Sequence, residues 1–262
     1  MLYKNKKTLS FLFSIICFVV MVQVIGFTSI SKLPKTFAVI FQESFFWIII
    51  YLINKYLIKQ RISWKVQCSY KELFFVLFPV YLYALFAIVL IQNKGVSQAG
   101  YPFIVGIFVS FFEEYYFRGI TLGVIISNIS KCKKIKLYGE VWLSCLGSSI
   151  IFALTHFLNL NSQPMQLTLM QVVQTFFLGM LLNALYVRSG SLIVPMMFHF
   201  LLNFISSIST LGMSQGTLNN SYGSLLSSFF IDFVYLVFAA FLLRRKKLRN
   251  INYLVRLYKN NQ

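Results

Sequence analysis

The chain has few charged residues, and acidic residues are the scarcest of them. Only 11% of its 262 residues are charged, and Asp and Glu together number six. Soluble domains carry about a quarter charged residues, so this composition excludes an ordinary soluble enzyme. A hydrophobic content of 58% also excludes a disordered chain. The mean hydropathy of +0.74 indicates a protein that crosses a membrane several times.

Cysteine is also scarce, and its spacing suggests no cross-linked scaffold. Cys17, Cys68, Cys132 and Cys145 form no CxxC pair, so neither a disulfide framework nor a thiolate metal site is indicated. Basic residues, in contrast, are abundant and give a formal net charge of +18. That charge would suggest nucleic-acid binding in a soluble protein. Because no basic stripe lies on a water-facing domain, we expect a lipid bilayer as the partner and no nucleic acid.

Long hydrophobic runs predict an all-α polytopic protein with about eight transmembrane helices. A helix needs about 20 apolar residues to cross the hydrocarbon core. Longer apolar stretches break at the polar segment 159–164, which ends in a proline, and at the Ser/Gly/Asn-rich segment 214–224. We therefore expect a single transmembrane domain over residues 1–262. Its predicted spans are 9–29, 37–57, 73–92, 101–127, 141–160, 166–187, 190–209 and 225–243.

The basic residues fall on one side of these eight predicted spans. If both termini are cytoplasmic, the outer side receives only Lys32, Lys35 and Lys94. An excess of Lys and Arg is typical of cytoplasmic loops. We therefore expect a multi-pass protein of the cell membrane with cytoplasmic N- and C-termini. The 20 basic residues on the cytoplasmic side are Lys4, Lys6, Lys7, Lys55, Lys59, Arg61, Lys65, Lys71, Lys131, Lys133, Lys134, Lys136, Arg188, Arg244, Arg245, Lys246, Lys247, Arg249, Arg256 and Lys259.

A few charged residues fall well inside predicted spans, where each costs about 2.5–3.5 kcal/mol and therefore marks a functional candidate. Glu114 and Arg118 are four residues apart and share a helix face, which predicts an ion pair and a structural role for Arg118. Glu113 is rotated about 100° around the helix axis from Glu114, so it cannot share Arg118 equally. Its carboxyl group is therefore available for proton transfer. Asp232 has no basic residue close in sequence, and the sequence assigns it no chemistry. Glu43 lies near the end of its span, an ordinary place for an acid.

Both histidines of the chain, His156 and His199, also lie in predicted spans. His199 and Asn203 are four residues apart, so the amide can orient the ring or donate a hydrogen bond to a substrate carbonyl. Phe152 precedes His156 by four residues, which places its ring beside the imidazole. Ordinary apolar packing explains Phe152 equally well.

These groups suit the hydrolysis of a carbonyl compound. Glu113 would take a proton from water, the imidazoles would position that water, and Asn203 would help to hold the oxyanion. Alternatively, Glu113, His156 and His199 could supply the three protein ligands of a catalytic zinc ion. The HExxH spacing that would support zinc is absent. We expect no cofactor, with zinc as the alternative; a proton-coupled transporter is a further hypothesis.

Three motifs together resemble the CAAX-protease and bacteriocin-processing family, also called the CPBP or Abi family. Glu113 to Arg118 matches its EExxxR motif, Phe152 to His156 its FxxxH motif, and His199 to Asn203 its HxxxN motif. They occur in the family's order within residues 100–205, which we take as the catalytic core.

This resemblance implies an intramembrane endopeptidase whose active site opens towards the cytoplasm. It implies that Glu113 and His156 activate water, and that His199 and Asn203 form the oxyanion site. Glu114, as part of the first motif, joins the catalytic candidates. The resemblance also implies a glutamate mechanism rather than a metal-dependent one.

The implied substrates are membrane-associated peptides or proteins. Bacterial relatives process peptides or confer immunity to bacteriocins, and a chain rich in Lys, Ile, Phe and Asn favours a bacterial plasma membrane. We therefore expect peptide or bacteriocin processing, or self-immunity. The alternative is a non-catalytic immunity or membrane binding protein on the same scaffold.

Overall fold

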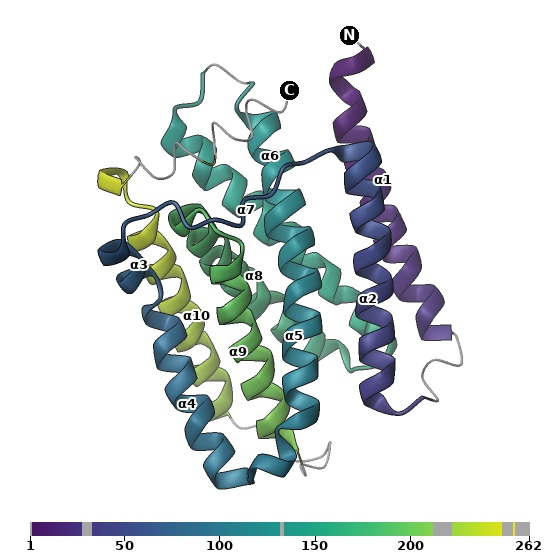
Figure 1. Cartoon of the computed structure of the whole chain (residues 1–262), viewed down its shortest axis with the longest axis vertical. Helices are drawn as coiled ribbons and strands as arrows, with labels where there is room; N and C mark the ends of the chain where they lie inside the picture. Colours follow the sequence, from purple (N-terminus) through teal and green to yellow (C-terminus); the bar gives the residue numbers. More distant parts are fainter. Residues whose placement is uncertain (1, 28–32, 132–133, 212–221, 248–253, 255–262) are drawn as a thin grey trace.

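The computed structural model describes residues 2–27, 33–131, 134–211, 222–247 and 254, and all regular structure within them is helical (Figure 1). The α-helices are α1 (Leu2–Phe27), α2 (Lys35–Ile53), α3 (Tyr70–Val76), α4 (Phe78–Lys94), α5 (Gly100–Glu114), α6 (Leu122–Ile129), α7 (Leu137–Thr155), α8 (Met165–Ser189), α9 (Ile193–Thr210) and α10 (Tyr222–Leu242). Wider π-helical turns form η2 (Asn54–Ile58) and η4 (Tyr115–Thr121), and tighter 3-10 turns form η3 (Val96–Gln98), η5 (His156–Asn161) and η7 (Arg245–Lys247).

The predicted all-α membrane fold is confirmed. Six helical runs among the described residues are long and apolar enough to cross a membrane, or seven if the bent pair α3 and α4 forms one span. A shorter apolar stretch, Ser228–Leu242, belongs to α10. The exact count of eight spans and the cytoplasmic placement of the termini stay predictions.

The predicted span 73–92 is not one straight helix. α3 ends at Val76 and α4 begins at Phe78, with a bend of 51° between them. Pro79 has no backbone N–H to donate to the carbonyl of Phe75, four residues earlier, so the helical hydrogen bonding is interrupted. The predicted span 73–92 therefore corresponds to this bent pair of helices.

Two apolar clusters form the interior of the bundle. One lies between α1, α2, α5 and η4 and includes Phe18, Phe46 and Phe152. The other surrounds α8 and includes Leu182 and Phe198. Phe152 contacts His156, and Phe198 precedes His199 in the sequence. The candidate site, which includes both histidines, therefore lies where these two clusters meet.

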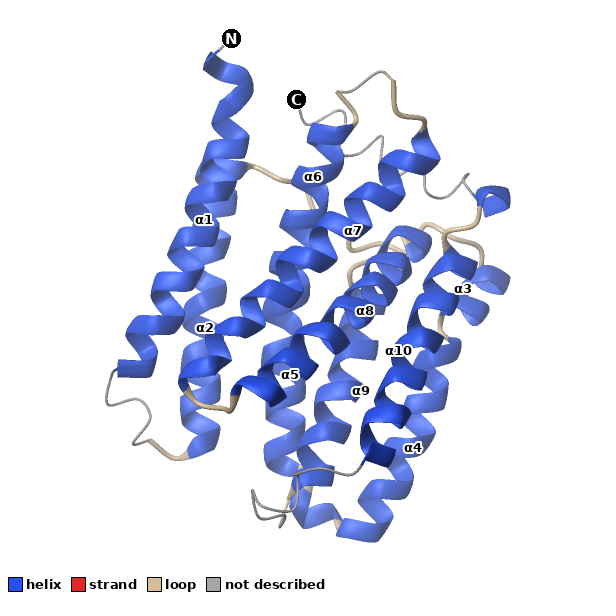
Figure 2. Ribbon diagram, turned by 180° about the vertical axis from the view of Figure 1, so that it is seen from behind, coloured by secondary structure: helices blue, strands red, loops and turns tan. Residues whose placement is uncertain are grey.

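The close approach of α5 and α9 depends on a glycine (Figure 2). A Cβ atom added at Gly106 would lie 2.7 Å from Cδ2 of Phe200 and 3.0 Å from its backbone oxygen. Small residues let helix backbones approach each other in membranes. Gly106 therefore lets the helix that carries Glu113 pack directly on the helix that carries His199.

We expect Gly106→Val to lower the stability of the folded protein by about 1–3 kcal/mol, because the added methyl groups overlap the Phe200 ring. Thermal unfolding of the purified protein in detergent measures this change. Gly100→Val is the matched control, since a Cβ atom there would meet no atom within 4 Å. Equal melting temperatures for the two variants would contradict the close packing.

The segment 59–69 lies across one end of the bundle, where backbone hydrogen bonds hold it to the turn between α8 and α9. The N–H of Gln67 donates to the carbonyl of Ser189 at 2.8 Å, and the N–H of Leu192 donates to the carbonyl of Ser63 at 2.9 Å. The turn between α8 and α9 is therefore covered by an ordered stretch of chain.

Candidate active site

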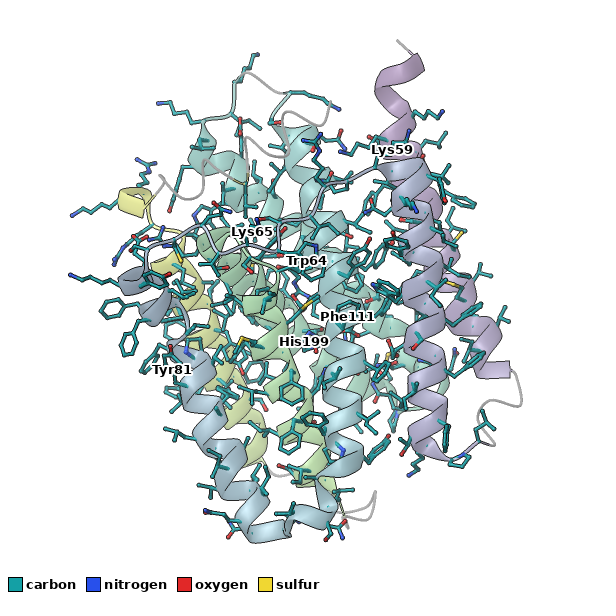
Figure 3. All side chains as sticks on the ribbon, viewed as in Figure 1. Lys59, Trp64, Lys65, Tyr81, Phe111 and His199 are labelled. Carbon is teal, nitrogen blue, oxygen red and sulfur yellow. The ribbon has the colours of Figure 1, made fainter. Side chains whose placement is uncertain are left out.

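The structure brings the three sequence motifs to one cavity. Glu113 of α5, His156 of η5, and His199 and Asn203 of α9 all line this space, which has a volume of about 310 Å³. Figure 3 shows His199 in the middle of the helical bundle, well away from its two ends. Such a volume is large enough for several water molecules, so groups from distant parts of the sequence face one shared space.

Glu114 lies behind this cavity and connects two of the motifs. Its side chain is fully buried, and its Oε1 accepts a hydrogen bond from Nη1 of Arg118 at 2.9 Å. The predicted ion pair is therefore confirmed. The same oxygen lies 2.7 Å from Nδ1 of His199. Because a carboxylate accepts, this contact places the hydrogen on Nδ1 and fixes the orientation of the ring.

The residues after Glu114 form the π-helical turn η4, which the sequence did not predict. All seven of its residues are buried, Arg118 among them. The guanidinium carbon of Arg118 lies 4.3 Å from the centre of the Phe152 ring, a cation–π distance. Single π-helical turns inside α-helices are frequent at functional sites. Here the turn keeps Arg118 inside the protein, between Glu114 and Phe152.

Glu113 is in a different environment from its neighbour Glu114. Its side chain is 21% exposed, whereas that of Glu114 is fully buried. Oε2 of Glu113 lies 3.5 Å from Nε2 of His199, so the imidazole stands between two carboxylates. The two adjacent acids thus point in different directions, as the 100° rotation predicts. Glu113 is the one that reaches the space where water can enter.

His156 begins η5, directly after α7 ends at Thr155. Its Nδ1 lies 3.0 Å from the backbone oxygen of Phe152. A carbonyl oxygen only accepts, so Nδ1 carries the hydrogen and Nε2 of the neutral ring keeps a lone pair. The predicted contact with the Phe152 ring is also confirmed, at 5.1 Å between ring centres and nearly perpendicular.

Asn203 supplies a hydrogen-bond donor that has no acceptor. It lines the cavity one helical turn after His199, and its Nδ2 is buried without a hydrogen-bond partner among the described residues. Buried polar groups in proteins are almost always paired. An unpaired amide donor beside a cavity is therefore suited to a carbonyl or oxyanion of a bound substrate.

The cavity contains one acid that the sequence analysis judged ordinary. Glu43 of α2 is 8% exposed and lines the same space as Glu113. Its Oε1 accepts a hydrogen bond from Nε2 of the neighbouring Gln42 at 3.2 Å. An acid six residues inside a predicted span is costly to insert, and that cost is the signal that marks Glu43 as a functional candidate.

Asp232 of α10 is not part of this site. It is 3% exposed and lines a separate cavity of about 180 Å³ with residues of α8. No described residue gives it an evident chemical role.

The described residues offer no metal-binding cluster. No three His, Cys, Asp or Glu side chains among them are arranged to hold a metal ion in this structure. The zinc alternative through Glu113, His156 and His199 stays a prediction. Cys17, Cys68 and Cys145 carry free thiols, and Cys132 lies outside the described residues.

The fold and this site define a class: membrane-spanning helical proteins that hold carboxylate, imidazole and amide groups around an internal cavity. Residues 95–205 match the family described as Rce1-like, type II CAAX prenyl endopeptidase Rce1-like. This is the CPBP/Abi family, so the resemblance drawn from the three motifs is confirmed for this part of the chain. The match supports a CAAX-type intramembrane protease. Comparison with curated proteins and with solved structures gave no match.

Proposed function

We propose that the chain is an intramembrane endopeptidase that hydrolyses peptide bonds with water activated by Glu113. The observation that carries this proposal is the meeting of Glu113, His156, His199 and Asn203 at one cavity inside a membrane-spanning bundle. The proposed substrates are membrane-associated peptides or proteins, and the proposed role is peptide or bacteriocin processing or self-immunity.

The first step activates a water molecule in the cavity. The carboxylate of Glu113 accepts a proton from this water, whose oxygen attacks the carbonyl carbon of the scissile peptide bond. Nε2 of His156 keeps a lone pair when its ring is neutral, so it accepts the second hydrogen of the water and orients it. Two acceptors on one water molecule leave its oxygen lone pair free for the attack.

The second step resolves the tetrahedral intermediate. Nδ2 of Asn203 donates to the oxyanion, and Nε2 of His199 donates to it in the imidazolium form of the ring, whose Nδ1–H stays on Glu114. Glu113 then returns its proton to the nitrogen of the leaving amine as the carbon–nitrogen bond breaks. The products are a free carboxyl end and a free amino end, and Glu113 is again a carboxylate.

Glu114 and Arg118 position these groups and touch no reacting atom in this mechanism. Glu114 holds Nδ1 of His199, and Arg118 holds Glu114. A buried carboxylate behind an imidazole fixes both the tautomer and the direction of the second ring nitrogen. This chain of contacts gives the second acid and the arginine of the EExxxR motif a positioning role behind His199.

Incubation of the purified full-length protein with synthetic leader peptides tests the proposed function. We expect new fragments by mass spectrometry, and we expect cleavage to persist at an undiminished rate in the presence of EDTA or 1,10-phenanthroline. Loss of cleavage that added zinc restores would overturn the glutamate mechanism. Intact peptides under all conditions would argue against peptidase activity itself.

Glu43 is expected to select substrates by charge. No Lys or Arg occurs among the described residues that line the cavity, so a basic substrate side chain would find two carboxylates and no competing cation. We expect Glu43→Gln to lower kcat/KM about tenfold for a peptide with Lys beside the scissile bond, the effect of one charged hydrogen bond. The same peptide with Leu in place of Lys is the control. An equal loss on both peptides would contradict charge selection.

A further inference from the structure

A separate cavity lies where the short helix α3 meets the C-terminal ends of α8 and α10. It has a volume of about 190 Å³, and the described residues that line it are Glu72, Phe75, Val76, Arg188, Phe241, Leu242 and Arg244. None of them lines the catalytic cavity, so the two spaces are distinct.

One wall of this cavity contains an ion pair. Nη2 of Arg188 donates to Oε1 of Glu72 at 2.7 Å, and the side chain of Arg188 is 4% exposed. The contact joins α3 to the last turn of α8. Glu72 is the one acid among the described residues that line this cavity, and Arg188 balances its charge. Any further cation at the cavity is therefore in excess.

Arg244 is that further cation. It is exposed, and its guanidinium carbon lies 4.0 Å from the centre of the Phe241 ring. It forms no ion pair with a carboxylate of any described residue. A guanidinium stacked on an aromatic face can still donate from its edge, and its planar N–H groups match the oxygen atoms of a phosphate. The cavity therefore offers a place for an anion at Arg244.

The remaining wall of the cavity is apolar and continues onto the surface. Phe75 is 65% exposed and Phe241 is 47% exposed, whereas Val76 and Leu242 are buried. Figures 1 and 2 both show α3 at the margin of the bundle, near the end of α10. A small anion would leave the exposed rings uncovered, whereas an acyl chain would cover them and remove apolar surface from water.

The cavity lies at a membrane boundary. Arg188 belongs to the last turn of α8, which is long and apolar enough to cross a membrane. The apolar α10 ends at Leu242, and the basic run 244–247 follows it almost directly. Basic pockets between transmembrane helices bind the headgroups of anionic lipids. The charged part of this cavity is therefore at the level of the headgroups, and its apolar part faces the hydrocarbon.

We propose that this cavity binds an anionic phospholipid, with the lipid phosphate on Arg244 and an acyl chain along Phe75 and Phe241. The binding is independent of the proposed peptidase activity and of which leaflet this end of the bundle faces. A phosphatidylcholine binds more weakly, because its own quaternary ammonium group competes with Arg244 for the phosphate. Glu72, already paired with Arg188, does not compensate by attracting that ammonium group.

Native mass spectrometry of the purified full-length protein in detergent tests this ligand class. The protein is titrated with dioleoyl phosphatidylglycerol, with dioleoyl phosphatidylcholine as the control of equal chain length, and with glycerol 3-phosphate as the headgroup alone. We expect saturable binding of phosphatidylglycerol, about tenfold tighter than that of phosphatidylcholine, and no binding of glycerol 3-phosphate at the same concentrations. Equal affinities for the two lipids, or equally tight binding of glycerol 3-phosphate, would overturn the proposal.

Arg244→Gln tests the phosphate contact. We expect it to raise the Kd for phosphatidylglycerol about tenfold, the effect of one charged hydrogen bond. Arg245→Gln is the matched control, because it removes the same charge from the next residue, whose guanidinium carbon lies 4.9 Å from the centre of the Tyr138 ring and which does not line this cavity. Equal losses of affinity in both variants would mean a diffuse attraction to the basic segment and would refute a site at Arg244.

Phe75→Ala tests the acyl-chain contact. We expect a Kd about fivefold higher for phosphatidylglycerol, because part of the covered apolar surface is removed. Phe74→Ala is its control, since Phe74 is similarly exposed on the same helix but does not line the cavity. Both rings are exposed, so these variants remain informative if Arg244→Gln does not fold. The same affinity in the two variants would contradict an acyl chain in this cavity.

Discussion

Glu113→Gln is expected to reduce kcat for peptide cleavage by at least about a thousandfold, because the variant has no carboxylate to take the proton from water. Gln has nearly the same size as Glu, so the cavity and the nearby His199 ring keep their arrangement. The measurement is the rate of fragment formation from a synthetic leader peptide, with the amount of folded protein checked by thermal unfolding in detergent.

Asp232→Asn is the matched control, since it also removes a buried acid from a membrane helix but in a different cavity. We expect it to cleave at the rate of the unmodified protein. Unchanged cleavage by Glu113→Gln would refute its role as the base. If Glu113→Gln stopped cleavage but still protected cells against a bacteriocin, the non-catalytic immunity hypothesis would explain the biological role.

The membrane fold was predictable because hydrocarbon imposes a simple rule on sequence. A spanning helix needs about 20 apolar residues, and runs of that length stand out in this chain. The bend at Pro79 has a cause that is visible in the sequence, because proline has no backbone N–H to continue the helical hydrogen bonding. The π-helical turn η4 was not predictable, because the contact of Arg118 with Phe152 of α7 joins two helices and arises only in the folded bundle.

The candidate site was predictable where its contacts are local. Glu114 with Arg118 and Phe152 with His156 are each four residues apart, so helical geometry alone brings them together. The contact between Glu114 and His199 joins residues 85 positions apart, and no spacing rule predicts it. Only the family motifs indicated that these segments meet.

Glu43 shows the opposite case, a residue whose place at the cavity follows from the packing of helices and not from a motif. It comes from α2, outside the matched region 95–205, and it reaches the cavity because α2 packs against α5. No motif includes it, and its position near the end of a predicted span suggested contact with water or headgroups. The burial of its side chain beside Glu113 therefore required the three-dimensional arrangement of the helices.

Arg118→Leu is expected to lower the free energy of unfolding by about 3–5 kcal/mol, because it leaves the buried carboxylate of Glu114 without its cation. It also removes the contact of the guanidinium with Phe152. We expect cleavage to fall as well, since Glu114 holds Nδ1 of His199. Titration of the purified protein with SDS measures the stability, and the peptide assay measures the activity.

The double variant Glu114→Leu, Arg118→Leu separates the two effects. Replacing both partners of a buried ion pair with apolar residues is often neutral for stability, so we expect the double variant to recover most of the stability lost by Arg118→Leu. Activity should not recover, because His199 no longer has a carboxylate behind its ring. If activity returned together with stability, the pair would only hold the helix together. If stability stayed low in the double variant, the packing of Arg118 on Phe152 rather than its charge would be the main stabilising contribution.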